Sequence, residues 1–134
     1  MTDEQVLEGG CACGSIRYRV SALPEDAGFC HCRICQKTTG APLIAWAVVA
    51  IDAFEYTRGE PCVYKSSPWG ERRFCPTCGT QLEYRESHSP RYVELNYATL
   101  DFPALIQPSR HIWCASAFPG LVISDDLPKY DGDG

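Results

Sequence analysis

The segment Cys75-Pro76-Thr77-Cys78-Gly79 has the form of a zinc knuckle, a tight turn that presents two sulfurs to one ion. A second two-sulfur unit, Cys11-Ala12-Cys13-Gly14, is also closed by a glycine, which permits the backbone conformation that such a turn needs. Together the two units supply four thiolates, the number that closes a structural zinc site. The sequence therefore predicts that Cys11, Cys13, Cys75 and Cys78 bind one structural zinc ion and clamp the N-terminal segment to a distant hairpin.

A third group, Cys30-His31-Cys32-Arg33-Ile34-Cys35, offers three thiolates within six residues, one fewer than a closed site requires. Zinc with three protein ligands keeps a fourth position for water or substrate, which is the arrangement of catalytic sites. Cys30, Cys32 and Cys35 are therefore the predicted ligands of a second, catalytic zinc, so that two zinc ions are expected per chain. A thiol that entered the open position would be held as its thiolate.

Other interpretations of the third group stay open at this point. Cys62, Cys114, His31 or His111 can supply a fourth ligand, in which case the second site is also closed and structural. Cys62 and Cys114 are otherwise expected to be buried neutral thiols. A redox pair at Cys32 and Cys35 is disfavoured because the flanking segments lack the alternating strands and helices of thioredoxin-like folds. An iron–sulfur cluster is disfavoured because no fourth cysteine follows at a ferredoxin-like spacing.

Strand-like patterns dominate the rest of the chain. Apolar and polar residues alternate from Ser15 to Val20 and from Tyr92 to Tyr97, and the apolar run Leu43–Ile51 has the composition of a central strand. Shorter strands are expected at Phe54–Thr57, Cys62–Lys65, Glu71–Phe74, Gln81–Tyr84 and Arg110–Cys114, and a turn at Pro24–Gly28. Only Cys32–Thr39 has a helical pattern, and Gly40 and Pro42 limit it to a short helical turn. The predicted class is all-β, a single domain over residues 1–134 built from short antiparallel strands.

Composition and charge exclude several classes of protein. The chain has 134 residues, nine cysteines and a formal net charge of −5, with an isoelectric point near 5.1, so that it lacks the clustered basic residues of a nucleic-acid-binding protein. The run Leu43–Ile51 covers nine residues, about half the roughly 20 that span a bilayer, so no membrane partner is expected. Without a secretory pattern near residue 1, and with many unpaired thiols, the expected location is cytoplasmic. The oligomeric state is not predicted.

Several residues near the cysteines are candidates for contact with a substrate. Arg33 and Lys37 follow the third group directly and are the predicted substrate-binding cations, while Arg72 and Arg73 precede the Cys75 knuckle. His31 is a candidate proton shuttle or a residue that orients its loop, and His111 is expected to pack at a strand end. Trp46 and Trp113 are expected in the core, whereas Trp69 lies in a loop.

The spacing of these motifs resembles that of the glutathione-dependent formaldehyde-activating enzyme family, also called the centromere protein V family. The resemblance rests on residues 9–14, 30–37 and 74–80, with Pro108, His111-Ile112 and residues 126–128 toward the end of the chain. It implies a zinc-bearing β-tent fold in which Cys11, Cys13, Cys75 and Cys78 hold the structural zinc and Cys30, Cys32 and Cys35 the catalytic one.

The resemblance also implies an activity. Members of the family join formaldehyde to glutathione to give S-(hydroxymethyl)glutathione and are classed among carbon–sulfur lyases. The expected function is therefore that of a zinc-dependent lyase-like enzyme acting on the adduct of a small thiol, by the resemblance glutathione, with an aldehyde. The alternative is a non-enzymatic, zinc-stabilised protein-binding module, in which both zinc sites are structural and exposed aromatics such as Trp69 form the contact surface.

Overall fold

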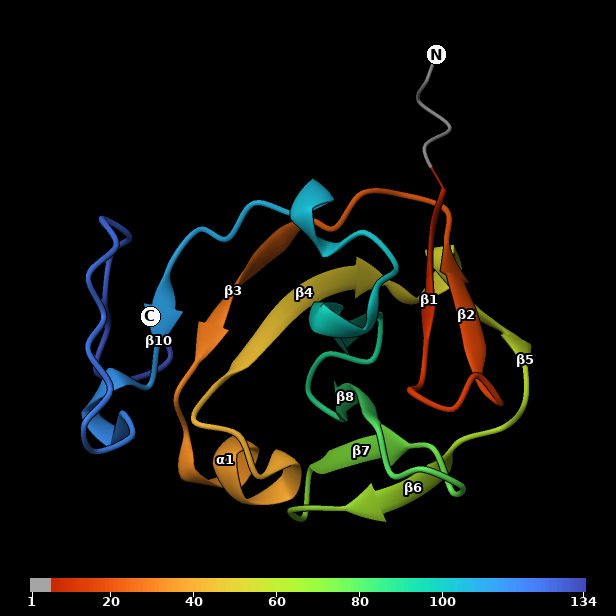
Figure 1. Cartoon of the computed structure of the whole chain (residues 1–134), viewed down its shortest axis with the longest axis horizontal. Helices are drawn as coiled ribbons and strands as arrows, with labels where there is room; N and C mark the ends of the chain where they lie inside the picture. The colour runs from red at the N-terminus through yellow and green to blue at the C-terminus, as the bar shows by residue number, and fades with distance from the viewer. Residues whose placement is uncertain (1–5) are drawn as a thin grey trace.

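The computed structural model describes residues 6–134, in which ten strands form two sheets (Figure 1). The first five residues of the expected domain lie outside the described residues. A three-stranded antiparallel sheet has the order β1-β2-β5, with bounds Leu7–Gly10, Arg17–Val20 and Phe54–Arg58. A seven-stranded sheet has the order β10-β3-β4-β9-β8-β7-β6. Its strands are β3 (Asp26–Cys30), β4 (Ile44–Ala50), β6 (Cys62–Lys65), β7 (Gly70–Phe74), β8 (Gln81–Glu86), β9 (Tyr92–Asn96) and β10 (His111–Ile112).

These sheets and one short α-helix confirm the predicted all-β class. Helix α1 (Arg33–Thr39) begins after Cys32, whose sulfur accepts a hydrogen bond from the Cys35 N–H, and ends at Gly40 in the left-handed conformation. Single 3-10 turns lie at Ile51–Ala53, Tyr97–Thr99, Pro103–Leu105 and Cys114–Ser116. No helix within residues 6–134 has both the length and the apolar character needed to cross a membrane.

The structure corrects two of the predicted boundaries and adds a strand. The expected turn at Pro24–Gly28 is mostly strand, because β3 pairs with β4 from Asp26 to Cys30. Gly28 permits this pairing: a Cβ atom there would lie 2.5 Å from the Arg110 carbonyl oxygen and 2.7 Å from the Trp46 ring. The expected strand Arg110–Cys114 is reduced to β10, since Trp113 adopts φ 59° and a 3-10 turn follows. Strand β1 was not predicted.

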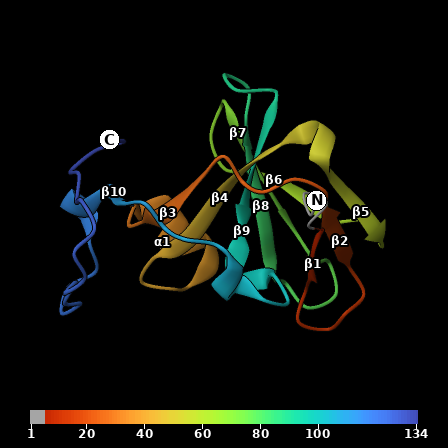
Figure 2. The ribbon, with the colours of Figure 1, turned by 90° about the horizontal axis from the view of Figure 1, so that it is seen from above.

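The main core lies between the two sheets, which face each other across it (Figure 2). Alternation along β4 and β9 decides which residues enter this core: Ala47, Val49, Val93 and Leu95 point inward and meet Leu7, Tyr18 and Val20 of the three-stranded sheet. The opposite face of the seven-stranded sheet carries a smaller cluster formed by Cys30, Cys35, Trp46 and Ile112. The third cysteine group therefore lies outside the main core, on the other side of the same sheet.

Candidate metal centres

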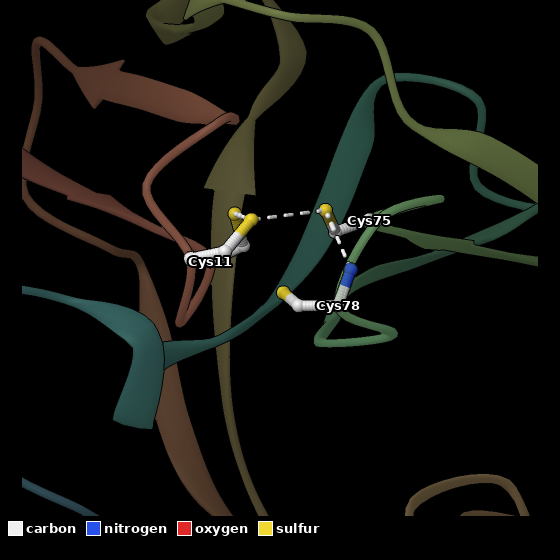
Figure 3. Close-up of side chains that lie close together, drawn as sticks. Cys11, Cys75 and Cys78 are labelled. Atoms are coloured by element: carbon white, nitrogen blue, oxygen red, sulfur yellow. Dashed lines mark hydrogen bonds between the residues drawn. The ribbon is translucent and has the colours of Figure 1, made fainter.

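Two turns that are distant in sequence bring the first four cysteines together. Cys11 and Cys13 lie in the turn between β1 and β2, and Cys75 and Cys78 lie in the turn between β7 and β8 (Figure 3). All four sulfurs lie within 4.8 Å of one another, with 3.6 Å between Cys11 and Cys13 and 3.8 Å between Cys13 and Cys75. Four thiolates around a tetrahedral zinc ion, with Zn–S bonds near 2.3 Å, lie about 3.8 Å apart. The geometry of this cluster therefore fits a four-thiolate zinc site.

Backbone N–H groups point at the sulfurs of this first cluster. Cys11 Sγ accepts from the Ile16 N–H at 3.2 Å, and Cys75 Sγ accepts from the Thr77 and Cys78 N–H groups at 3.3 and 3.4 Å. Burial raises the pKa of Cys11, but the hydrogen bonds from Ile16, Ser15 and the neighbouring thiols outweigh it and lower the pKa to about 7. Hydrogen bonds from Thr80 lower the pKa of Cys78 to about 5. The turns thus favour the thiolate forms of Cys11 and Cys78, the form in which cysteine binds a metal ion.

The first cluster also joins the two sheets. The β1–β2 turn belongs to the three-stranded sheet and the β7–β8 turn to the seven-stranded sheet. Besides the four sulfurs, the Ala12 N–H donates to Thr80 Oγ1 at 3.0 Å across the same junction. A metal ion held here would therefore clamp the two sheets at one end.

The second cluster is assembled where β3 ends and α1 begins. Cys30 is the last residue of β3, Cys32 caps α1 and Cys35 lies in its first turn. The sulfurs of Cys30 and Cys35 are 3.7 Å apart, and those of Cys32 and Cys35 are 2.9 Å apart. The first separation already equals that of two thiolates on one zinc ion, and the second must grow by about 1 Å. All three sulfurs lie within 4.8 Å of one another, so that this cluster can also hold a metal ion.

In the second cluster, ionisation of one thiol opposes ionisation of its two neighbours. Hydrogen bonds from the Cys30 and Cys35 thiols lower the pKa of Cys32 to about 2. The hydrogen bonds to Cys32 and Cys35, together with burial, raise the pKa of Cys30. Three thiolates so close together need a cation among them, because like charges at this separation repel strongly. A divalent ion bound by the three sulfurs would supply it.

Arg72 on β7 supplies a positive charge beside this cluster. Its side chain is only 7% exposed, and its Nη1 and Nη2 atoms both lie 3.8 Å from Cys35 Sγ. The guanidinium also donates from Nε to Ser66 Oγ at 3.1 Å and lies 4.7 Å from the centre of the Tyr84 ring. Arg72, which the sequence offered only as one of several cations, is thus the arginine that contacts the second cluster.

A cavity of about 250 Å³ opens onto the second cluster. Cys30 and Cys35 lie in its wall, together with Ile44, Trp46, Trp69, Arg72, Tyr84, Glu86, Glu94, Ile112, Trp113 and Asp133. Strand register brings its polar residues to one face, because Arg72 pairs with Tyr84 and Tyr84 pairs with Glu94 across β7, β8 and β9. Burial first, and then the charges of Glu86 and Asp133, raise the pKa of Glu94 to about 7. The cavity therefore combines thiols, one cation and a half-buried carboxyl group.

The residues considered as a fourth ligand lie away from the three sulfurs. Within residues 6–134 the second cluster consists of Cys30, Cys32 and Cys35, and no fourth histidine, cysteine or acidic residue joins it. Cys62 is exposed on β6 and Cys114 is half-buried in a 3-10 turn, so the expectation that both are buried thiols is wrong. The second cluster thus offers three sulfurs to a metal ion and has a neighbouring cavity.

His31 and His111 form a buried chain that ends at Asp125. His31 Nε2 lies 2.8 Å from His111 Nδ1, and His111 Nε2 lies 2.8 Å from Asp125 Oδ2. When the His111 Nε2–H donates to the carboxylate, Nδ1 accepts from the His31 Nε2–H. Burial lowers the pKa of His31, and its ring lies outside the cavity wall. This favours the loop-orienting role of His31 over proton transfer in the cavity.

The remaining candidates divide between the cavity and the surface. Arg33 and Lys37 are exposed on α1 and do not line the cavity, and Arg33 donates to the Gln36 side chain. Trp46 is buried as expected, but Trp113 is 41% exposed and Trp69 49% exposed at the cavity wall, so the expected core position of Trp113 is wrong.

Sequence reasoning missed Tyr84, Glu86, Glu94 and Asp133 as cavity residues. Tyr84 and Glu86 are two residues apart on one strand, a spacing that places both side chains on the same face. That alternation was visible in the sequence. The pairing that brings Glu94 to the same face was not, because it depends on strand register between β8 and β9.

The chain is similar to several known proteins. Residues 6–116 match the family model described as glutathione-dependent formaldehyde-activating enzyme. A putative glutathione-dependent formaldehyde-activating enzyme of Halomonas elongata is 30% identical over 118 residues, which cover 78% of this chain and 72% of that protein. An uncharacterized lyase of Schizosaccharomyces pombe is 27% identical over 88 residues, 64% of each chain. The crystal structure of a Rhodobacter sphaeroides protein shares the fold, with a TM-score of 0.60 and 21% identity over 92% of this chain and 98% of that one.

Proposed function

Because the chain belongs to the family of glutathione-dependent formaldehyde-activating enzymes, we propose that it forms or splits the adduct of a small thiol and a small aldehyde. In the forward direction the thiol sulfur bonds to the carbonyl carbon, and the proton of the thiol passes to the carbonyl oxygen. By the name of the family the thiol is glutathione and the aldehyde formaldehyde, and the adduct is S-(hydroxymethyl)glutathione. The reaction is that of a carbon–sulfur lyase.

One observation carries the proposal: Cys30 and Cys35 lie in the wall of a cavity large enough for a small substrate. Cys30, Cys32 and Cys35 are the proposed ligands of a catalytic zinc ion. A zinc ion held by these three thiolates would stabilise a substrate thiolate or polarise a substrate carbonyl. By contrast, the four sulfurs of the first cluster leave no such position, so we assign Cys11, Cys13, Cys75 and Cys78 to a structural zinc.

Arg72 supplies the positive charge that would allow the second cluster to bind a substrate thiolate. One divalent ion and three thiolates have a formal charge of −1, which opposes the approach of a further thiolate. The buried guanidinium beside Cys35 offsets that charge and holds the sulfur in place with two N–H groups. Arg33 and Lys37 stay predictions for contact with substrate carboxylates that extend beyond the cavity. The reduced thiols that both sites need agree with a cytoplasmic location.

The proposal is tested by metal content and by reaction rate on the freshly reduced full chain. Elemental mass spectrometry should find close to two zinc ions per chain, one of which a mild chelator removes more slowly when glutathione is present. Exchange NMR should show faster interconversion of formaldehyde, glutathione and their adduct than in buffer. Cys35→Ser should lose this rate and one zinc, whereas Cys62→Ser, which changes an exposed thiol outside both clusters, should retain both.

Two inert zinc ions and no acceleration would favour the non-enzymatic, zinc-stabilised binding module instead. Full turnover by Cys35→Ser would exclude the second cluster as the reaction site. These two results are independent, because the first concerns whether the chain is an enzyme and the second where the reaction takes place.

A further inference from the structure

The cavity beside the second cluster has an excess of negative charge. Glu86, Glu94 and Asp133 contribute three carboxyl groups to its wall, and Arg72 is the one basic residue that lines it within the described chain. The Arg72 guanidinium is already engaged with Cys35 Sγ, Ser66 Oγ and the face of Tyr84. The cavity therefore lacks a free cation for a substrate carboxylate but offers carboxylates to a substrate cation.

Glu94 contributes its carboxyl group to the cavity wall from the middle of β9. It lies on β9 in register with Tyr84 on β8 and with Val48 on β4, so its side chain shares the face that holds Tyr84 and Arg72. Within residues 6–134 no hydrogen bond or ion pair engages its carboxyl group. Glu86 accepts from the Tyr84 hydroxyl with one oxygen, at 3.1 Å, which leaves its other oxygen for a ligand.

The surroundings of Glu94 favour a positive partner. Burial and the neighbouring carboxylates of Glu86 and Asp133 raise its pKa to about 7, which means that its negative charge is poorly compensated in the free protein. A cation in the cavity would stabilise the ionised form, whereas a further anion would destabilise it. Arg72 lowers the same pKa but is the smaller influence.

We propose that the thiol substrate carries a protonated amine and that Glu94, assisted by Glu86, binds this ammonium group while the sulfur reaches the second cluster. This inference rests on the proposed function and adds the chemical class of the substrate, an aminothiol. Glutathione belongs to that class through the amine of its γ-glutamyl residue, which would then lie beside Glu94. Glu94 and Glu86 are thus specificity-determining residues for the thiol.

Three small thiols test the inference directly. Cysteamine, 2-mercaptoethanol and 3-mercaptopropionate carry an ammonium, a hydroxyl and a carboxylate group, respectively, at the end opposite the sulfur. Binding to the zinc-loaded full chain is followed at pH 8, where Glu94 is ionised, by the fluorescence of Trp46, Trp69 and Trp113. These are all three tryptophans of the chain, and all line the cavity.

We expect cysteamine to bind at least tenfold more tightly than 2-mercaptoethanol, and 3-mercaptopropionate to bind more weakly than both. The three thiols also differ in acidity, so affinities for the wild type alone do not isolate the effect of Glu94. The decisive quantity is the ratio of the dissociation constants of 2-mercaptoethanol and cysteamine, and how much a variant changes that ratio. Glu94→Gln should reduce the preference for cysteamine over 2-mercaptoethanol about tenfold, since it removes the charge and keeps the shape of the side chain. Glu86→Gln should reduce it by a smaller factor. Glu60→Gln removes a charge from an exposed loop residue and should leave the preference unchanged.

The outcomes separate this inference from the proposed function. If all three thiols bind and 3-mercaptopropionate binds as tightly as cysteamine, the inference is wrong and the proposed function stands. The inference is equally wrong if Glu94→Gln and Glu86→Gln both keep the wild-type preference. If none of the three thiols binds the zinc-loaded chain, both fail.

Discussion

Replacing Glu94 by glutamine should make the stability of the protein less dependent on pH. Glutamine resembles the protonated carboxyl group in size, so the two proteins should differ little near pH 5. In the folded chain burial raises the pKa of Glu94 from 4.5 to about 7. At 1.36 kcal/mol per pKa unit, ionisation of this residue costs the folded state about 3 kcal/mol.

The direction of the effect follows from proton linkage. A native pKa above the unfolded value means that the folded chain holds the proton more tightly. The stabilisation is therefore complete below about pH 4.5 and is lost as the pH rises through about 7. The free energy of unfolding of the wild type should fall, relative to that of Glu94→Gln, by about 2–3 kcal/mol between pH 5 and pH 8, because part of the effect is already lost at pH 5.

Urea denaturation of both zinc-loaded, reduced proteins at pH 5, 6, 7 and 8 measures this difference. Titration of the thiols and of bound metal affects both proteins alike and cancels in the subtraction. Glu71→Gln, a half-buried glutamate paired with Arg73 outside the cavity wall, serves as the control. Parallel curves for wild type and Glu94→Gln across the four pH values would refute the buried, uncompensated position assigned to Glu94.

Three further changes test other parts of the structure. Cys78→Ser should remove one zinc ion per chain and lower the melting temperature, while Cys62→Ser should change neither; equal metal content in the two variants would refute the assignment of the first cluster. Gly28→Ala should lower the free energy of unfolding by about 1–3 kcal/mol, because the new methyl group would overlap the facing Arg110 carbonyl oxygen at 2.5 Å. Urea denaturation measures this change. An unchanged denaturation midpoint would mean that β3 and β10 can move apart freely. His111→Phe should lower the free energy of unfolding by about 1–3 kcal/mol, because the buried His31 ring loses its hydrogen-bond partner. A variant as stable as the wild type in urea denaturation would show that this chain of hydrogen bonds adds nothing to folding.

The two cysteine clusters lie at different places in the fold, and the third group lies on the outer face of the seven-stranded sheet. The first cluster joins the sheets and is closed by four sulfurs. The second lies across the sheet from the main core, where a cavity can reach it without opening that core. A substrate can therefore enter and leave while the packing between the sheets stays unchanged.

Local patterns made most of the strands and the cysteine groups predictable. Cysteines two to five residues apart can bind one ion where the chain turns, so Cys30, Cys32 and Cys35 could be grouped from spacing, and the structure brings their sulfurs within 4.8 Å. Period-two alternation located β2 and β9, and the apolar run Leu43–Ile51 located β4. It failed at β3, where Asp26-Ala27-Gly28 has the composition of a turn and becomes a strand because Trp46 and the Arg110 carbonyl pack against the glycine.

The all-β class and the three groups of cysteines follow from the order of residues along the chain, because both depend on near neighbours. That Cys11 and Cys13 face Cys75 and Cys78 followed from counting ligands, and the structure brings all four within 4.8 Å. Folding of the whole chain is needed to bring Arg72, Tyr84 and Glu94 to one cavity wall and to join His31 to His111 and Asp125. These contacts depend on the register of paired strands and on packing between distant segments, and one residue of slippage would turn the side chains to the other face.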